Sequence, residues 1–242
     1  MERVIYDRIK ELEQDHWWFV ARRDILRQEL ERLDLPPGAR ILEVGCGAGG
    51  NIPLLQDFGT VEALEPDAPS RAYVAERTGV DVQGGLLPDG LPYPPQTYDL
   101  VCAFDVIEHV DEDAASVAAL ARLVKPGGAM LTAVPAYQWM WSHHDELHHH
   151  KRRYRLGAYR RLFEDAGLMV EKASYFNTLL FAPAWAQRTV KKLTGSTVPD
   201  DAMPAPWLNG LLTSIFRMEK GWLAHADLPF GMSILLAARK PL

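Results

Sequence analysis

A cluster of glycines directly after a short apolar segment constrains the fold of this chain more than any other feature. The apolar segment is Ile41–Val44, and Gly45, Gly47, Gly49 and Gly50 follow it at once. Because glycine has no Cβ atom, the backbone can turn tightly there and a ligand can lie against it. A strand that ends in such a turn before a helix is typical of a doubly wound sheet, whose ligands bind at the carboxyl ends of the strands. We therefore predict an α/β fold with a ligand site at this turn.

The rest of the chain alternates between strand-like and helix-like patterns, which predicts a doubly wound, Rossmann-like, seven-stranded sheet. The predicted strands are residues 41–44, 61–64, 80–83, 99–104, 129–134, 168–175 and 232–238. Helices are predicted over most of residues 1–34 and over 68–77, 114–124 and 159–166. A polar loop rich in His and Arg at 138–155 and a predominantly helical insertion at 176–228 interrupt the alternation. We predict a single domain over residues 1–242, made of an N-terminal helical lid (1–34), a ligand-binding core (39–175), the insertion (176–228) and a final strand (229–242).

Composition and charge exclude several broad classes of protein. Of the 242 residues, 48% are hydrophobic and 24% are charged, as in ordinary globular proteins, and the formal net charge is −6. A general nucleic-acid binder is usually basic, so we expect no nucleic-acid partner. The two cysteines, Cys46 and Cys102, are too few for a disulfide scaffold and fit a reducing compartment. The charged N-terminus lacks the apolar core of a signal peptide and no apolar run has the length of a membrane span, so we expect a soluble, cytoplasmic protein.

An acidic residue at the end of the second predicted strand complements the glycine turn. Glu65 lies 20 residues after Gly45, where a carboxylate can accept hydrogen bonds from the two hydroxyls of a ribose. This combination indicates a cofactor that contains adenosine. Gly45, Gly47 and Gly50 also match the G-x-G-x-x-G pattern of dinucleotide-binding proteins, so a nicotinamide-dependent oxidoreductase is an alternative. A glycine turn that serves only packing is a second alternative.

Four segments around this turn resemble the class I S-adenosylmethionine-dependent methyltransferases in order and spacing. They are LEVGCGAGG, ALEPD, TYDLVCAFDVIEHV and ARLVKPGGAMLTAVP, which cover most of residues 39–135. The resemblance implies transfer of a methyl group from S-adenosylmethionine to a small-molecule, lipid-linked or glycan-linked acceptor. We expect oxygen as the acceptor atom, an expectation that the resemblance itself does not supply. A protein that keeps the fold and the cofactor without catalysis is a further alternative.

The same resemblance implies which residues hold the cofactor. Glu43 would engage the methionine ammonium group, and Glu65 would hold the ribose hydroxyls. Gly85 and Leu86 stand where many relatives have Gly-Asp, so the adenine would rely on backbone groups or apolar contact. The complete implied set is Glu43, Gly45, Cys46, Gly47, Gly49, Glu65, Pro66, Gly85, Leu86, Phe104, Asp105, Val106, Trp17 and Arg22.

Two outer segments, DHWWFVARRDIL and WSHHDELHHHKRRY, resemble a narrower subgroup of methyltransferases that is often associated with glycan, lipid or natural-product biosynthesis. The first segment suggests that Trp17, Trp18 and Arg22 form a lid over the cofactor. Packing of both tryptophans onto the sheet is one alternative. A surface salt bridge is the alternative for Arg22.

Methyl transfer to a hydroxyl needs a group that accepts the hydroxyl proton. In a doubly wound fold the acceptor is expected after the fifth strand, where Asp145 and His150 match the D…H-x-R-x-Y run of the subgroup. Arg152 and Tyr154 complete that run and are the predicted substrate-binding residues. His109, of the D-x-x-E-H element, is the third catalytic candidate. Asp145 and His150 could instead orient the loop, and His109 could form a polar wall of the site.

Five histidines gather in the polar loop, at His143, His144, His148, His149 and His150. His144 and His148 are four residues apart and would share a helix face, as metal ligands do. We nevertheless expect no metal, because the segment is predicted as a loop, no cysteine is nearby and methyl transfer needs no metal ion.

The basic run after these histidines contrasts with the acidic chain, because six of the 26 basic residues lie between Lys151 and Arg161. Residues 151–155 could be a solvated basic face, a site for a phosphate or carboxylate on the acceptor, or a contact with an anionic membrane. The insertion at 176–228 mixes apolar and basic residues. It could be a lid over a hydrophobic acceptor, a homodimer surface, a peripheral membrane contact or part of the core.

Overall fold

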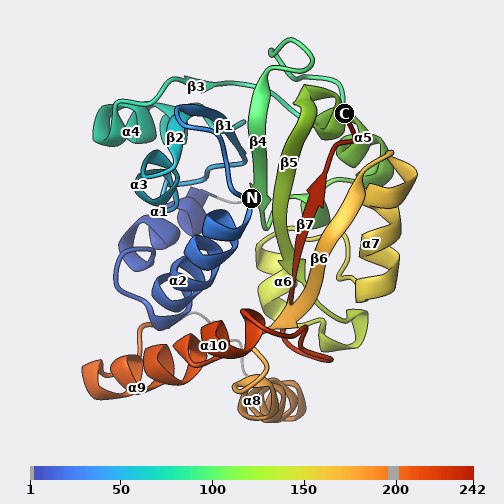
Figure 1. Ribbon diagram of the computed structural model, residues 1–242. Helices are drawn as coiled ribbons and strands as arrows, with labels where there is room; N and C mark the ends of the chain where they lie inside the picture. The colour runs from blue at the N-terminus through green and yellow to red at the C-terminus, as the bar shows by residue number, and fades with distance from the viewer. Residues whose placement is uncertain (1–2, 196–201) are drawn as a thin grey trace.

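The computed structural model describes residues 3–195 and 202–242, and these residues form the predicted doubly wound α/β fold (Figure 1). Seven strands make one sheet in the order β3-β2-β1-β4-β5-β7-β6. The strands pair in parallel except for β7, which runs antiparallel to both β5 and β6. The strands are β1 (Ala39–Val44), β2 (Gly59–Leu64), β3 (Val82–Gln83), β4 (Tyr98–Phe104), β5 (Val124–Pro135), β6 (Met169–Phe176) and β7 (Ser233–Arg239). The strand order reverses between β1 and β4, which is where folds of this kind bind ligands.

The helices surround this sheet. They are α1 (Arg3–Leu12), α2 (Trp17–Arg32), α3 (Ile52–Gln56), α4 (Ala68–Thr78), the short 3-10 helix η1 (Ile107–His109), α5 (Asp113–Leu123), a second 3-10 helix η2 (Gln138–Met140), α6 (His143–Leu147), α7 (Leu156–Asp165), α8 (Phe181–Thr194), α9 (Pro206–Arg217) and α10 (Glu219–Leu223). Helix α4 illustrates why these elements begin and end where they do. The Asp67 side chain accepts a hydrogen bond from the Ser70 N–H at its start, and Gly79 ends it in the left-handed conformation.

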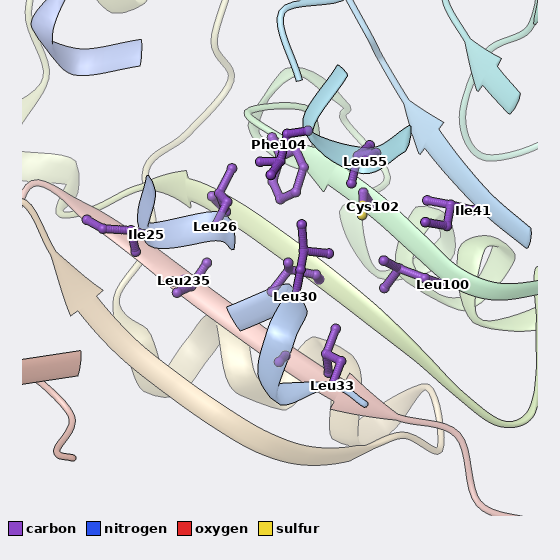
Figure 2. Close-up of a cluster of buried hydrophobic side chains, with 14 of the residues drawn as sticks. Ile25, Leu26, Leu30, Leu33, Ile41, Leu55, Leu100, Cys102, Phe104 and Leu235 are labelled. Carbon is purple, nitrogen blue, oxygen red and sulfur yellow. The ribbon is translucent and has the colours of Figure 1, made fainter. Parts of the chain in front are cut away.

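Both faces of the sheet are buried, because successive side chains on a strand point to opposite faces. Ile41 belongs to the core cluster shared with α2 and α3, whereas its neighbour Leu42 belongs to the cluster shared with α5 and α7. Figure 2 shows part of the first cluster, in which Ile25, Leu26 and Leu30 of α2 face the strands that carry Leu100 and Leu235. Burial on both faces explains why the strands read as apolar runs in the sequence.

The N-terminal segment consists of two helices. Residues 13–16 separate α1 from α2, and the His16 side chain accepts a hydrogen bond from the Trp18 N–H to cap α2. A side chain that satisfies a free N–H favours a new helix start at that residue. The N-terminal helices predicted within residues 1–34 are thus confirmed for the described residues, although the prediction did not say where one helix ends and the next begins.

The segment 138–155, predicted as a loop, contains η2 and the short helix α6. A capping box starts α6: the Ser142 side chain bonds the backbone of Asp145, and the Asp145 side chain bonds the backbone of Ser142. Because these local hydrogen bonds stabilise five residues only, no hydrophobic period indicates the helix. The loop prediction was wrong for these residues.

The described part of the insertion is predominantly helical as predicted, while its residues 196–201 lie outside the described residues. Figure 1 shows α8, α9 and α10 together at the lower end of the sheet. Helix α9 packs against α2, with the rings of Trp17 and Phe216 6.0 Å apart between centroids. Helix α8 differs, because none of its residues is buried. Trp185 and Leu193 are 51% and 81% exposed on it. Core packing therefore describes α9 but not α8. Within residues 3–195 and 202–242, no helix has both the length and the apolar character needed to cross a membrane.

Candidate cofactor and acceptor site

The glycine turn between β1 and α3 uses backbone conformations that only glycine adopts easily. Gly45, Gly47 and Gly49 have φ angles of +68°, +56° and +83°. A Cβ atom on Gly45 would lie 2.6 Å from Cγ2 of Val106, so the end of β4 crowds the turn. The Gly45 N–H donates a hydrogen bond of 2.7 Å to the carbonyl of Leu64, at the end of β2. The turn is therefore fixed between the two strands on either side of β1.

Glu65, directly after β2, is buried and its carboxylate accepts three hydrogen bonds. Oε2 accepts one from the Gly47 N–H at 2.9 Å. Oε1 accepts one from the Tyr6 hydroxyl and one from the Asp67 N–H, each at 3.0 Å. Burial raises the pKa of Glu65, and these hydrogen bonds oppose the rise. Sequence reasoning missed Tyr6, whose place on the periodic helix α1 gave no sign that it reaches Glu65.

Glu43 lies at the base of the turn and is almost fully enclosed. Its Oε1 accepts a hydrogen bond of 2.8 Å from the Asn51 side chain. Its Oε2 has no hydrogen-bond partner among the described residues. Burial raises the pKa of Glu43 to about 7, against the effect of the Asn51 hydrogen bond. A buried carboxylate oxygen without a partner is costly unless a ligand satisfies it, and the ammonium group of S-adenosylmethionine has the donors to do so.

Arg22 of α2 forms an ion pair with Asp105, the residue that follows β4. The Arg22 side chain is buried, and its guanidinium carbon lies 4.2 Å from the centroid of the Trp18 ring. Asp105 has a φ of +55°, a conformation that costs about 1–3 kcal/mol for a residue with a Cβ atom. The alternative of a surface salt bridge for Arg22 is therefore wrong, because the Arg22 side chain is buried. The ion pair joins two residues of the predicted cofactor set.

The two tryptophans of α2 have different neighbours. The ring of Trp17 packs on Phe216. The backbone N–H of Trp17 donates a hydrogen bond of 2.8 Å to the side-chain oxygen of Asn209 in α9. Trp18 stacks on Arg22. Both tryptophans are partly buried against the core. Packing therefore describes both tryptophans in part: Trp17 also contacts α9, and Trp18 also lies beside the Arg22–Asp105 pair.

The remaining residues of the predicted cofactor set line the same edge of the sheet. Cys46 is buried, and burial raises the pKa of its thiol. The Pro66 carbonyl accepts a hydrogen bond of 2.8 Å from Arg71. Phe104 is part of the core, whereas Leu86 is 66% exposed. Gly85 lies so close to the next loop that a Cβ atom would be 2.3 Å from the Gly90 carbonyl oxygen.

Beyond β5, the chain brings two of the predicted catalytic residues together. Nδ1 of His150 lies 2.8 Å from Oδ1 of Asp145. The same Oδ1 accepts a hydrogen bond of 2.7 Å from Nε of Arg153, and Asp145 is fully buried. Burial would raise the pKa of Asp145, but the His150 hydrogen bond and the Arg153 charge outweigh it and hold that pKa below its usual range. Asp145 therefore remains an anion that fixes the His150 ring.

His109, the third catalytic candidate, lies next to this pair. The rings of His109 and His150 are 4.6 Å apart between centroids and nearly perpendicular. Burial, followed by the nearby His150 and His148, lowers the pKa of His109 to about 3. The backbone also connects the segment of His109 with that of His150, since the Lys151 N–H donates a hydrogen bond of 2.7 Å to the Glu108 carbonyl. His109 is thus an uncharged imidazole that faces His150.

The predicted substrate-binding residues both contact Asp113, the first residue of α5. Arg152 donates a hydrogen bond of 2.9 Å to Oδ2 of Asp113, and the Tyr154 hydroxyl donates one of 2.9 Å to the same oxygen. Lys151 pairs with Asp111 at 3.2 Å. The start of α5 therefore neutralises much of the basic run, and sequence reasoning missed Asp113 as its partner.

Together these features define a class of protein. A doubly wound sheet carries a glycine turn, a buried carboxylate with an unused oxygen, and a second buried acid at the end of the neighbouring strand, which is the arrangement of an adenosyl-cofactor domain. A histidine fixed by a carboxylate lies beyond β5, on the side where such folds place the second ligand.

A family model described as a methyltransferase domain matches residues 18–173, and the chain belongs to that family. A probable S-adenosylmethionine-dependent methyltransferase of Mycolicibacterium smegmatis is 34% identical over 126 residues, which are 51% of this chain and 48% of that protein. A ubiquinone biosynthesis O-methyltransferase of Xylella fastidiosa is 34% identical over 102 residues, or 40% of this chain and 42% of that protein. The chain thus spans about half the length of these relatives.

A solved structure shows the same fold across the chain. The methyltransferase in complex with the Trm112 activator of Haloferax volcanii superposes with a TM-score of 0.65 at 20% identity, covering 98% of this chain and 95% of that one. The class I methyltransferase resemblance is confirmed at the level of fold and family. S-adenosylmethionine is the cofactor that the family and the named relative indicate.

Proposed function

We propose that this protein transfers a methyl group from S-adenosylmethionine to a hydroxyl oxygen of a small-molecule or lipid-linked acceptor, beside His150. The observation that carries the hydroxyl assignment is the contact of 2.8 Å between Nδ1 of His150 and Oδ1 of Asp145. A carboxylate that holds one ring nitrogen leaves the other nitrogen unprotonated and oriented, ready to accept a proton. A hydroxyl needs such a group, because it arrives protonated.

The bound cofactor supplies an electrophilic methyl group on a positively charged sulfur. Glu43 would hold its ammonium group through the unused Oε2, and Glu65 its ribose hydroxyls. In the metal-free protein, Nε2 of His150 would accept the proton of the acceptor hydroxyl, so that the acceptor oxygen could take the methyl group that the cofactor would supply. Orientation of the two reactants supplies roughly 7–11 kcal/mol, and proton acceptance adds about 10²–10⁴-fold in rate.

The name of one relative and the insertion support a lipid-linked acceptor. The Xylella fastidiosa relative is named as a ubiquinone biosynthesis O-methyltransferase, which fits transfer to oxygen. On this chain, exposed apolar residues gather on α8 and α9, at Trp185, Val190, Leu193, Trp207 and Leu211. We name these five residues the apolar surface of the insertion. Acceptors of glycan or natural-product type remain within the proposal.

The apolar surface of the insertion fits peripheral contact with a membrane. Around the axis of α8, Trp185, Val190 and Leu193 fall on one arc, and Arg188 lies on the other side, where it donates a hydrogen bond of 3.1 Å to the Met140 carbonyl. The helix therefore turns its apolar arc to solvent, and tryptophan and leucine on such an arc suit the headgroup boundary of a bilayer. Sedimentation with phosphatidylglycerol vesicles should carry down the protein, and Trp185→Ser with Leu193→Ser should abolish this. The membrane contact would be contradicted if the wild-type protein stayed in the supernatant with vesicles and behaved as a dimer in analytical ultracentrifugation.

A labelling assay tests the methyl transfer itself. Purified protein would receive S-adenosylmethionine with a tritiated methyl group and phenols with a free hydroxyl, with or without a polyprenyl tail. The matched controls are the same phenols already methylated on oxygen. We expect label only on the free phenols, and more on the tailed ones. Amines and carbon acceptors would be offered in parallel reactions. Label on these and none on the free phenols, or tight binding of NAD without binding of S-adenosylhomocysteine, would overturn the proposal.

A further inference from the structure

One buried acid at the acceptor site has no partner that the methyl transfer explains. Glu108 lies in η1, directly after β4, and none of its surface is exposed. Neither of its carboxylate oxygens has a hydrogen-bond partner within the described part of the chain. A buried carboxylate in this state is strongly unfavourable unless a proton or a cation compensates it. Glu108 must therefore carry either a proton or a bound cation, although the Arg153 and Arg22 charges act on it.

Two histidines lie within reach of this carboxylate. One oxygen of Glu108, one ring nitrogen of His109 and one ring nitrogen of His150 all lie within 4.8 Å of one another. Ligands at about 2.1 Å from a single ion can be at most about 4.2 Å apart. Small side-chain rotations would thus bring all three atoms onto one ion. The backbone already holds the two segments together through the Lys151 N–H and the Glu108 carbonyl, 2.7 Å apart.

The outer contacts of both histidines are those of metal ligands. Nδ1 of His150 faces Oδ1 of Asp145, which leaves Nε2 for an ion. The backbone of His148 lies close enough to the His109 ring to raise its pKa slightly, against the larger effect of burial. Metal-bound histidines nearly always use their second nitrogen in this way, with a carboxylate or a backbone carbonyl. Two oriented histidines and one acid are also the ligand set of several catalytic zinc sites.

We propose that Glu108, His109 and His150 bind a divalent transition-metal ion of the zinc type, with one coordination position left for the acceptor. The imidazole ligands favour such ions over Mg²⁺. The inference deepens the proposed function, since an ion at this place would bind the acceptor hydroxyl and lower its pKa. In the metal-loaded protein His150 would be a ligand in place of the proton acceptor, the ion would hold the acceptor oxygen, and the hydroxyl proton would pass to water. This revises the expectation of no metal: of the five clustered histidines, only His150 takes part.

Cobalt binding tests the site without any assay of activity. The full chain, stripped with a chelator, would be titrated with Co²⁺ while the visible absorption of the bound ion is recorded, and Zn²⁺ would then be added as competitor. We expect one saturable site that Zn²⁺ displaces and Mg²⁺ does not. Glu108→Gln should weaken Co²⁺ binding about 100-fold or more, and Asp145→Asn about 10–100-fold. His143→Ala, an exposed neighbour, is the matched control and should bind as the wild type does.

Thermal unfolding separates a metal ligand from a simple buried acid. We expect Zn²⁺ to raise the midpoint of the wild type and to leave that of Glu108→Gln unchanged. A wild type without a Co²⁺ signal or a Zn²⁺ shift, together with a more stable Glu108→Gln, would mean that Glu108 is a protonated core residue and would overturn the inference. Binding of Mg²⁺ in place of Co²⁺ would overturn it as well. Methyl transfer is read separately by the labelling assay, so either proposal can fail without the other.

Discussion

The Glu65 carboxylate accepts a hydrogen bond of 2.9 Å from the backbone N–H of Gly47. This contact joins the end of β2 to the glycine turn after β1, across the edge of the sheet where the strand order reverses. The ribose-type acid and the turn are therefore one structural unit. A change in Glu65 should act on both the cofactor contact and the shape of the turn.

Replacing Glu65 by alanine should weaken cofactor binding without unfolding the protein. The variant Glu65→Ala removes the proposed acceptor of the ribose hydroxyls and the partner of Gly47. Because hydrogen bonds to a charged group contribute about 1.5–3 kcal/mol, we expect S-adenosylhomocysteine affinity to fall about 10–100-fold in calorimetric titration. Glu76→Ala, on the exposed side of α4, is the control and should bind normally. Wild-type affinity in Glu65→Ala would show that the ribose lies elsewhere.

Glu43 should make the stability of the cofactor-free protein fall as pH rises. Its folded pKa is about 7, whereas an unfolded glutamate titrates near 4.3. Between these values the folded state holds a proton that the unfolded state releases, so the contribution of Glu43 to stability is largest below about pH 4 and decreases until pH passes about 7. Glu43→Gln removes this component and should gain about 1–3 kcal/mol over the wild type at about pH 8. Equal pH profiles of the unfolding free energy would contradict the raised pKa.

The glycine turn should tolerate no side chain at its first position. Gly45→Ala must adopt a φ of +68° and place a Cβ atom 2.6 Å from Val106. We expect a loss of about 1–3 kcal/mol in the free energy of unfolding, and weaker cofactor binding. Gly210→Ala in α9, where a Cβ atom would meet no other atom within 4 Å, is the control and should gain about 0.5–1 kcal/mol. Chemical denaturation measures both free energies of unfolding. Equal changes in Gly45→Ala and Gly210→Ala would contradict the described conformation of the turn.

His150 should matter for turnover and not for the cofactor. His150→Ala removes the imidazole that Asp145 orients, so turnover in the labelling assay should fall about 10²–10⁴-fold. The affinity for S-adenosylhomocysteine should stay within about twofold of the wild type, because the glycine turn, Glu43 and Glu65 are unchanged. Full turnover in His150→Ala would remove this residue from the reaction.

The sequence predicted the strands, the glycine turn and the acid after the second strand, because each of these depends on residues that are close together along the chain. The apolar strand at 41–44, the glycines after it and Glu65 obey local rules of strand, turn and spacing. For this reason the sheet and the predicted cofactor residues could be placed from their order. The antiparallel β7 was not foreseen, because direction depends on where the insertion returns the chain.

The contacts that complete the site join distant residues and left no local signal. Tyr6 and Glu65 are 59 positions apart, and Arg22 and Asp105 are 83 apart. Asp113 contacts Tyr154 because the segment after β5 folds back to the start of α5, and no periodicity in the sequence indicates this contact. Burial of Glu108 is likewise a result of packing, although its D-x-x-E-H element was recognised.

A crystal structure of the S-adenosylhomocysteine complex tests the central claim most directly. We expect the ribose hydroxyls on the Glu65 carboxylate, the ammonium group at Oε2 of Glu43, and the sulfur atom directed toward His109 and His150. A ribose that contacts neither carboxylate oxygen of Glu65, or a sulfur atom directed away from these histidines, would contradict the account.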